Sequence, residues 1–313
     1  MKAIPTWAAL VLALIVGSMM AIQSRVNGEL ANRLDDPFVG TALVFILAVL
    51  LILIALVAWR PGREGIARLA QARRSHTIPW WMLGGGLVGG MYVLSQSLVV
   101  TTLGVALFSV ASVGGQTLGG AIMDRTRIVP GGPFVLTPAR AIGAGLAILA
   151  VVVSQSASLN MDVPLWMLFL PIAVGLAQGW QQAVNARVRM EARSSFTTTL
   201  LNATTGLLLL VPAATIKLLT VGMPAEFPRE WWLYTGGLLG AVFIGIAPIV
   251  VHATGALMFT LIAITGQLGT ALLLDLLRAD AQPLPVTTIA SVVLAFLAVV
   301  VGSLRKRPPR LHR

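Results

Sequence analysis

The chain is 313 residues long, with 57% hydrophobic residues, only 11% charged residues and a net charge of +11. Soluble proteins carry about 25% charged residues, so this composition cannot cover the surface of the two soluble domains that the length would allow. It also excludes a disordered chain, and the lack of Cys excludes a disulfide scaffold, a thiolate metal site and a cysteine nucleophile.

Ten apolar runs follow one another along the chain, and each has about the 20 residues needed to cross the hydrocarbon of a bilayer. In chain order these predicted spans are Pro5–Ser24, Phe38–Ala58, Trp80–Val100, Thr102–Met123, Pro138–Ser156, Leu165–Asn185, Phe196–Leu219, Trp231–Val251, Gly255–Leu277 and Val286–Leu304. The connections between them are too short for a soluble domain. We therefore expect an all-α polytopic membrane protein with ten transmembrane helices.

Lys and Arg are distributed unevenly over the connections. With the N-terminus in the cytoplasm, 17 of the 22 basic residues lie on the cytoplasmic side and 5 on the outer side. Because positive charge accumulates inside, this bias predicts that both termini are cytoplasmic and that the chain ends in a basic cytoplasmic tail. The net charge is thereby explained by topology, and we expect no nucleic-acid partner.

The chain resembles itself in two register shifts. A shift of 158 aligns residues 17–43 with 175–201, and a shift of 151 aligns residues 80–124 with 231–275 with thirteen identities in 45 positions. The repeat divides the chain into residues 1–156 and 157–313, with five predicted helices in each. Because five is odd, the second repeat enters the membrane from the opposite side, an arrangement typical of secondary transporters.

Two groups of residues carry a resemblance to a known family. The first span ends in Gln23-Ser24-Arg25-Val26-Asn27, which is echoed by residues 181–185, and the pairs Gly115-Gln116 and Gly266-Gln267 are each followed by an acid near the helix end. With ten spans in a five-plus-five inverted repeat, the chain resembles the YdcZ-like inner-membrane exporters of the drug/metabolite transporter superfamily.

The resemblance implies a multi-pass protein of the bacterial inner membrane, in contact with lipid, that transports a small-molecule substrate and is neither an enzyme nor dependent on a cofactor. The smaller relatives, the small multidrug resistance proteins, work as pairs of four-helix subunits, so a homodimer stays open. Those relatives use a Glu inside the first helix for proton coupling. In this chain Glu29 lies past the apolar core of the first span, so their coupling mechanism does not carry over directly.

Polar side chains inside spans are costly in lipid and usually face the protein interior or a water-filled path. Gln23 and Asn27 are four residues apart on one helix face, and Gln178, Gln181 and Asn185 share a face of the sixth predicted span. Inversion places the first pair towards the outer side and the last pair towards the inner side. They are either symmetric gates or substrate contacts, or they form hydrogen bonds that hold the bundle together.

Gln116 and Gln267 occupy equivalent places in the two repeats, where their amides suit an uncharged or zwitterionic solute. Packing through the neighbouring glycines is the alternative. Two acids end the same spans. Asp124 is flanked by Arg125 and Arg127 and is expected to pair with them, whereas Asp275 lies in a more apolar run and is the better candidate for proton coupling.

The sequence offers no catalytic or ligand-binding motif of the usual kinds. No Gly-rich run has the Lys of a phosphate loop, no cluster has metal-ligand spacing, and no hydrolase triad can be assembled. Three functions compete. The first is a secondary-active or facilitative transporter of small organic solutes; the second is a flippase for a lipid-linked carrier, for which Arg25, Arg33 and Arg278 could bind a phosphate; the third is a membrane assembly factor, against which the repeat argues.

Overall fold

The computed structural model describes residues 5–58, 60–130, 132–133, 137–155, 166–224, 226–276 and 286–303, and every regular element in these ranges is helical. The α-helices are α1 (Thr6–Leu34), α2 (Pro37–Ala58), α3 (Arg60–Arg74), α4 (Gly85–Met123), α5 (Pro138–Gln155), α6 (Trp166–Ala192), α7 (Ser195–Val221), α8 (Gly236–Thr254), α9 (Ala256–Leu276) and α10 (Val286–Ser303). Two short 3-10 helices, η1 (Trp80–Gly84) and η2 (Trp231–Tyr234), precede α4 and α8. The prediction of an all-α chain is confirmed.

Four helical stretches of the described residues are long and apolar enough to cross a membrane by length and composition. They are Thr6–Leu34, Pro37–Leu56, Ser195–Val221 and Trp231–Thr254. Shorter apolar helices cover Pro138–Val153, Ala256–Thr270 and Ile289–Gly302. The number of ten crossings stays a prediction.

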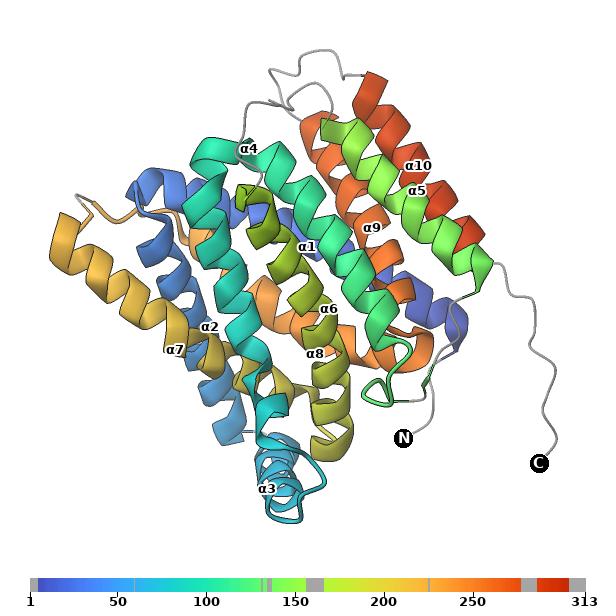
Figure 1. Cartoon of the computed structure of the whole chain (residues 1–313). Coiled ribbons are helices and arrows are strands. Elements are labelled where there is room, and N and C mark those ends of the chain that lie inside the picture. The colour runs from blue at the N-terminus through green and yellow to red at the C-terminus, as the bar shows by residue number, and fades with distance from the viewer. Residues whose placement is uncertain are drawn as a thin grey trace.

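The third and fourth predicted spans form a single helical ribbon, α4, that reverses direction. Near its start Gly85 packs against Asn185 of α6, and near its end Gly119 packs against Leu176 of the same helix. In a straight helix Gly85 and Gly119 would be about 51 Å apart, whereas Asn185 and Leu176 are separated by about 14 Å along α6. The ribbon must therefore fold back, and Figure 1 shows it rising in one arm and descending in a second.

The helices pack in pairs around a central group. In Figure 1, α5 and α10 lie side by side at one end of the molecule, and α2 and α7 lie side by side at the other end. The two helices of each pair are in contact with each other. Between them α1 packs on α8 and α9, and α6 packs on both arms of α4. Each helix therefore contacts partners far away in the sequence, and α1 and α6 each pack mainly on elements of the other half of the chain.

Local conformations recur at the shifts found in the sequence. Asp35 after α1 and Arg193 after α6 are 158 positions apart, and both have a left-handed backbone, with φ of 51° and 52°. The next residue caps the following helix in each case: the Asp36 carboxylate accepts from the N–H groups of Phe38 and Val39, and the Ser194 hydroxyl accepts from Thr197 N–H. The same local structure thus connects the first two helices of both halves.

Close helix contacts recur in the same way. A Cβ on Gly17 of α1 would collide with the Ala263 carbonyl oxygen of α9, and a Cβ on Gly175 of α6 would collide with the Ser112 carbonyl oxygen of α4. Gly17 and Gly175 are 158 positions apart, and Ser112 and Ala263 are 151 apart. Small residues allow helix backbones to approach closely in a membrane bundle, so the repeated sequence specifies a repeated packing.

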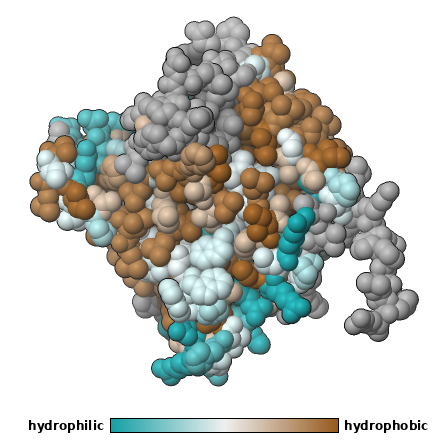
Figure 2. Space-filling view, in the orientation of Figure 1, coloured by the Kyte–Doolittle hydropathy of each residue, from teal (hydrophilic) through white to brown (hydrophobic). Residues whose placement is uncertain are grey.

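The sequence did not predict α3, which lies in the connection after the second span. Its Leu69 and Ala72 are buried against Ile78 and Val188, while its basic residues stay on the outside. The helix forms because it can bury this narrow apolar face on the end of α6. Figure 2 shows the result as a hydrophilic end over α3, below a broad hydrophobic surface.

Large apolar side chains on several helices are left uncovered by the rest of the described chain. Phe169 is 69% exposed, Leu208 69% and Leu219 83%. Exposed apolar surface on this scale marks a membrane contact in a protein of this composition.

Candidate functional site

A small cavity lies where α1, α4, α6 and α9 meet. Its lining residues are Met20, Gln116, Gln178, Gly179, Gln182, Phe259, Thr260, Ala263, Ile264 and Gln267. The structure thus brings together three of the residues singled out in the sequence, namely Gln116, Gln178 and Gln267. The cavity volume is about 20 Å³, room for about one water molecule, so an organic solute could enter only if the helices moved apart.

The four glutamines of the cavity have no protein partner among the described residues. Gln116, Gln178, Gln182 and Gln267 are half-buried, and none of them makes a hydrogen bond to another described group. Buried amides are normally paired. Four amides that converge on a cavity without pairing are therefore available to a molecule inside it.

Gln181 and Asn185 of α6 are arranged differently, because both form hydrogen bonds with Asn202 of α7. Gln181 Nε2 donates to Asn202 Oδ1 of α7 at 3.0 Å, Asn202 Nδ2 donates to Asn185 Oδ1 at 2.8 Å, and Asn185 Nδ2 donates to Asn202 Oδ1 at 3.3 Å. Asn202 Nδ2 also donates to the Thr198 carbonyl at 3.0 Å. All three amides are buried, so the network joins α6 to α7 as a closed polar contact.

Gln23 and Asn27 of α1 have no third amide equivalent to Asn202. Gln23 Nε2 donates to the Gly236 carbonyl at 2.9 Å, and Asn27 packs against the same glycine with its Oδ1 buried and unpaired among the described residues. The position equivalent to Asn202 is held by Val44, which is buried and cannot donate. The two equivalent amide pairs therefore differ: Gln181 and Asn185 form a network with Asn202, and Gln23 and Asn27 have no such third amide.

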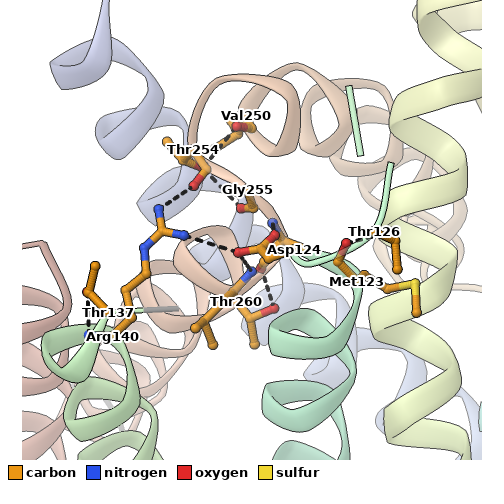
Figure 3. A network of polar contacts seen from close by, with 11 residues as sticks. Met123, Asp124, Thr126, Thr137, Arg140, Val250, Thr254, Gly255 and Thr260 are labelled. Atoms are coloured by element: carbon orange, nitrogen blue, oxygen red, sulfur yellow. Dashed lines mark hydrogen bonds and ion pairs between the residues drawn. The ribbon is translucent and has the colours of Figure 1, made fainter. Parts of the chain in front are cut away.

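A second polar centre lies where α4 ends (Figure 3). The Asp124 carboxylate accepts from Ala256 N–H at 2.6 Å and Leu257 N–H at 3.4 Å, at the start of α9. It also pairs with Arg140 of α5 at 3.4 Å, and Arg140 donates to the Thr254 carbonyl at 3.2 Å. The sequence led us to expect Arg125 and Arg127 as partners. The start of α9 attracts the carboxylate instead, because its free N–H groups and helix dipole favour an anion.

This centre fixes the helix that carries much of the cavity. Gly255, with φ of 86°, makes the sharp break between α8 and α9, and its Cα faces the Asp124 carboxylate. Thr260, one turn further along α9, lines the cavity. Any movement that opens the cavity by shifting the start of α9 must therefore disturb the contacts of Asp124.

Stability should depend on pH through Asp124, which lies in the connection after α4. Burial raises the pKa of this carboxyl from 3.8 to about 6, although the bond from Ala256 and the charge of Arg140 oppose the shift. Since the folded pKa lies above the unfolded one, Asp124 stabilises the folded protein fully below about pH 4. This stabilisation is lost as the pH rises through about 6. We expect roughly 2 kcal/mol less unfolding free energy at pH 7 than at pH 4 from this group.

The measurement is denaturant unfolding in detergent across that range, with Asp124→Asn as the control. Because Asn does not titrate, the variant should lack this part of the pH dependence. Equal pH profiles for the two proteins would contradict the assignment.

The remaining residues predicted from the sequence do not add to these two sites. Asp275 belongs to α9, but its side chain is outside the described residues, as is Arg278. Arg33, one of the three residues considered for a lipid phosphate, pairs instead with Glu29 at 2.8 Å and with Glu230 before η2. Arg33 thus ties the end of α1 to the α7–α8 connection at the surface.

Sequence reasoning missed three residues of these sites. Asn202 is an amide inside the predicted span Phe196–Leu219, which was a usable signal, but its repeat partner is Val44 and symmetry drew attention elsewhere. Gln182 was not singled out, although it lies four residues after Gln178 and therefore on the same helix face. Arg140, sixteen residues from Asp124, had no sequence signal at all.

Comparisons with known proteins agree with this architecture. The model of a protein family described as "Putative inner membrane exporter, YdcZ" matches residues 8–153 and 166–301. A solved structure described as "Crystal structure of protein" is similar with a TM-score of 0.63 and 18% identity, over 95% of this chain and 96% of that one. This likeness shows a shared fold. No curated protein matches the chain.

Proposed function

Because this chain belongs to the YdcZ family of inner-membrane exporters, we propose that it moves small organic solutes by alternating access between two inverted five-helix repeats, as a secondary-active or facilitative transporter. The family is one of membrane transporters rather than enzymes, and the chain is a multi-pass protein of the inner membrane. The proposal adds the mechanism, the repeats at residues 1–156 and 157–313, and the residues that carry transport.

The observation that carries the proposal is the cavity with four unpaired glutamine amides. Gln116 comes from the first repeat and Gln267 occupies the equivalent position of the second. A site shared between inverted repeats is where such transporters hold their substrate. In the proposed cycle, Gln116, Gln178 and Gln267 contact the solute, and the cavity widens first to one side and then to the other.

Several observations support the inverted repeat. The family matches begin at residues 8 and 166, which are 158 positions apart, the same shift that relates the first helices of the two halves. The caps after α1 and α6 and the glycine contacts of α1 and α6 recur at the same spacing. Exchanging two equivalent packings gives one state open to each side.

The asparagine of each amide pair lies beyond the cavity along its helix, as a gate should. Asn27 follows Met20, and Asn185 follows Gln178, by seven residues, or about 10 Å along each helix. Gln23 and Asn27 form the outer gate of the proposed cycle, and Gln181 and Asn185 form the inner one. In the described structure the inner gate has its hydrogen bonds made, and the outer gate has fewer.

Contacts between connections support the predicted sidedness. Residues of three connections predicted to be cytoplasmic gather in one apolar cluster, with Leu69, Ile78, Ile128 and Ala192 among its members. The ion pair of Arg33 and Glu230 joins two connections predicted to be outside.

Reporter fusions test this sidedness. Fusions that end at Gly222, after α7, and at Arg313 should give opposite signals, with the end of the chain in the cytoplasm. Matching signals at the two positions would contradict an odd number of crossings between them, and with it the proposed topology.

Solute flux tests the function itself. Proteoliposomes with the purified protein should exchange at least one solute from a panel of metabolites and cationic drugs. The double variant Gln116→Leu/Gln267→Leu should transport that solute at least tenfold more slowly. Repeating the assay with a pH gradient, in the parent and in Asp275→Asn, tests the proposed proton coupling. A double variant that transports like the parent would show that the cavity is not the substrate site.

A further inference from the structure

The lining of the cavity provides hydrogen-bonding groups without charge. Its polar side chains are the amides of Gln116, Gln178, Gln182 and Gln267 and the hydroxyl of Thr260, and no described lining residue is ionisable. Each amide offers an acceptor oxygen and two N–H donors. The Thr260 hydroxyl already donates to the Ala256 carbonyl at 2.9 Å, so the four amides are the free groups.

The lining also contains apolar groups, in part because the two repeats differ here. Gln178 of α6 and Met20 of α1 are 158 positions apart and both line the cavity, one with an amide and the other with a thioether. Gln182 adds a second amide beside Gln178, whereas Phe259 and Ile264 add apolar surface from α9. A molecule in the cavity would meet amides from α4, α6 and α9 and apolar groups from α1 and α9.

From this lining we infer that the cavity selects small uncharged solutes that carry hydroxyl, carbonyl or amide groups together with some apolar surface, and that it rejects ions of either sign. The inference rests on the proposed function, because it assigns the substrate class of the same site. An ion that leaves water for a dry site needs a counter-charge, and a zwitterion needs one at each end. Amides satisfy a neutral polar solute without any such partner.

The test measures the charge selectivity of the cavity directly, without knowing the natural substrate. The chain has no native Cys, so Gln267→Cys creates a single thiol. Three methanethiosulfonates of matched length are applied to membrane vesicles: the neutral 2-hydroxyethyl, the cationic 2-trimethylammonioethyl and the anionic 2-sulfonatoethyl reagent. Rates are normalised to Gln71→Cys, an exposed position on α3. Gln178→Cys, on another helix of the same cavity, guards against a poorly folded first variant.

We expect the neutral reagent to react at least tenfold faster than either charged reagent after normalisation. Adding Gln116→Glu beside Gln267→Cys should raise the cationic rate at least tenfold and leave the anionic rate low. Comparable rates for neutral and charged reagents would overturn the inference while leaving the pathway intact. If no reagent reached either thiol from either side, the cavity would not lie on a pathway, and the proposed function would fail with it.

Discussion

Replacing Gly115 by Ala should destabilise the folded protein by about 1–3 kcal/mol, because the added methyl group has nowhere to go. The Cβ would collide with the Ile172 carbonyl oxygen and would lie 2.9 Å from Leu176 N, both in the backbone of α6. Backbone atoms cannot rotate away, so the second arm of α4 and α6 must separate. The measurement is the free energy of unfolding in detergent.

The neighbouring glycine provides the matched control. A Cβ on Gly114 meets no atom of the described residues within 4 Å, so Gly114→Ala should be neutral or should stabilise the helix by up to about 1 kcal/mol. Gly175→Ala strains the same interface from the side of α6, and its cost should therefore not add fully to that of Gly115→Ala. Equal stability of the Gly114 and Gly115 variants would show that the two helices do not approach so closely.

The second large effect is expected from substitutions at Asn202 and Val44, the equivalent residues that make the two proposed gates differ. Asn202→Val removes the centre of the inner amide network, and Val44→Asn supplies the missing amide beside the outer pair. The first weakens closure on the inside and the second strengthens closure on the outside, so both should favour the inward-open state. Interhelical polar contacts are worth roughly 0.6 kcal/mol each and up to about 2, which corresponds to a shift of about three-fold to thirty-fold.

The shift can be read from the rate at which a thiol at Gln116→Cys reacts with an impermeant reagent added from the cytoplasmic side. Asn185→Ala should act in the same direction and Asn27→Ala in the opposite one. Asn27→Ala and Asn185→Ala could instead move the rate in the same direction, or change only the amount of folded protein. In that case the amides only pack the helices together, and the proposal that they act as gates is wrong.

Much of the fold could be predicted from the sequence because lipid imposes a simple rule on it. Apolar runs of sufficient length gave the helical class and most helix positions, and the charge of the connections gave an expected orientation. The helix α3 and the close packing of both arms of α4 on α6 could not be placed in this way. Both depend on the surface of α6, against which Gly85, Gly119 and Leu69 pack, and a surface built from distant residues has no local signature.

The residues of the candidate site also fall into those that the sequence could predict and those that it could not. Gln116 and Gln267 could be selected because equivalent positions of a repeat come together when its halves interlock. The pairing of Asp124 with Arg140 and with the start of α9 could not, since it depends on how two connections fold. The difference between the two amide pairs was missed because symmetry was used as the guide, and Val44 stands where the second repeat has Asn202.

Alternating access is tested most directly by labelling Gln116→Cys with one impermeant thiol reagent from each side of the membrane in turn. The chain contributes no other thiol. We expect the position to react from both sides, and Asn202→Val to raise the cytoplasmic rate and lower the outer rate together, because the two open states draw on one population. Reaction from one side only, or a variant that raises both rates at once as an open pore would, would contradict alternating access.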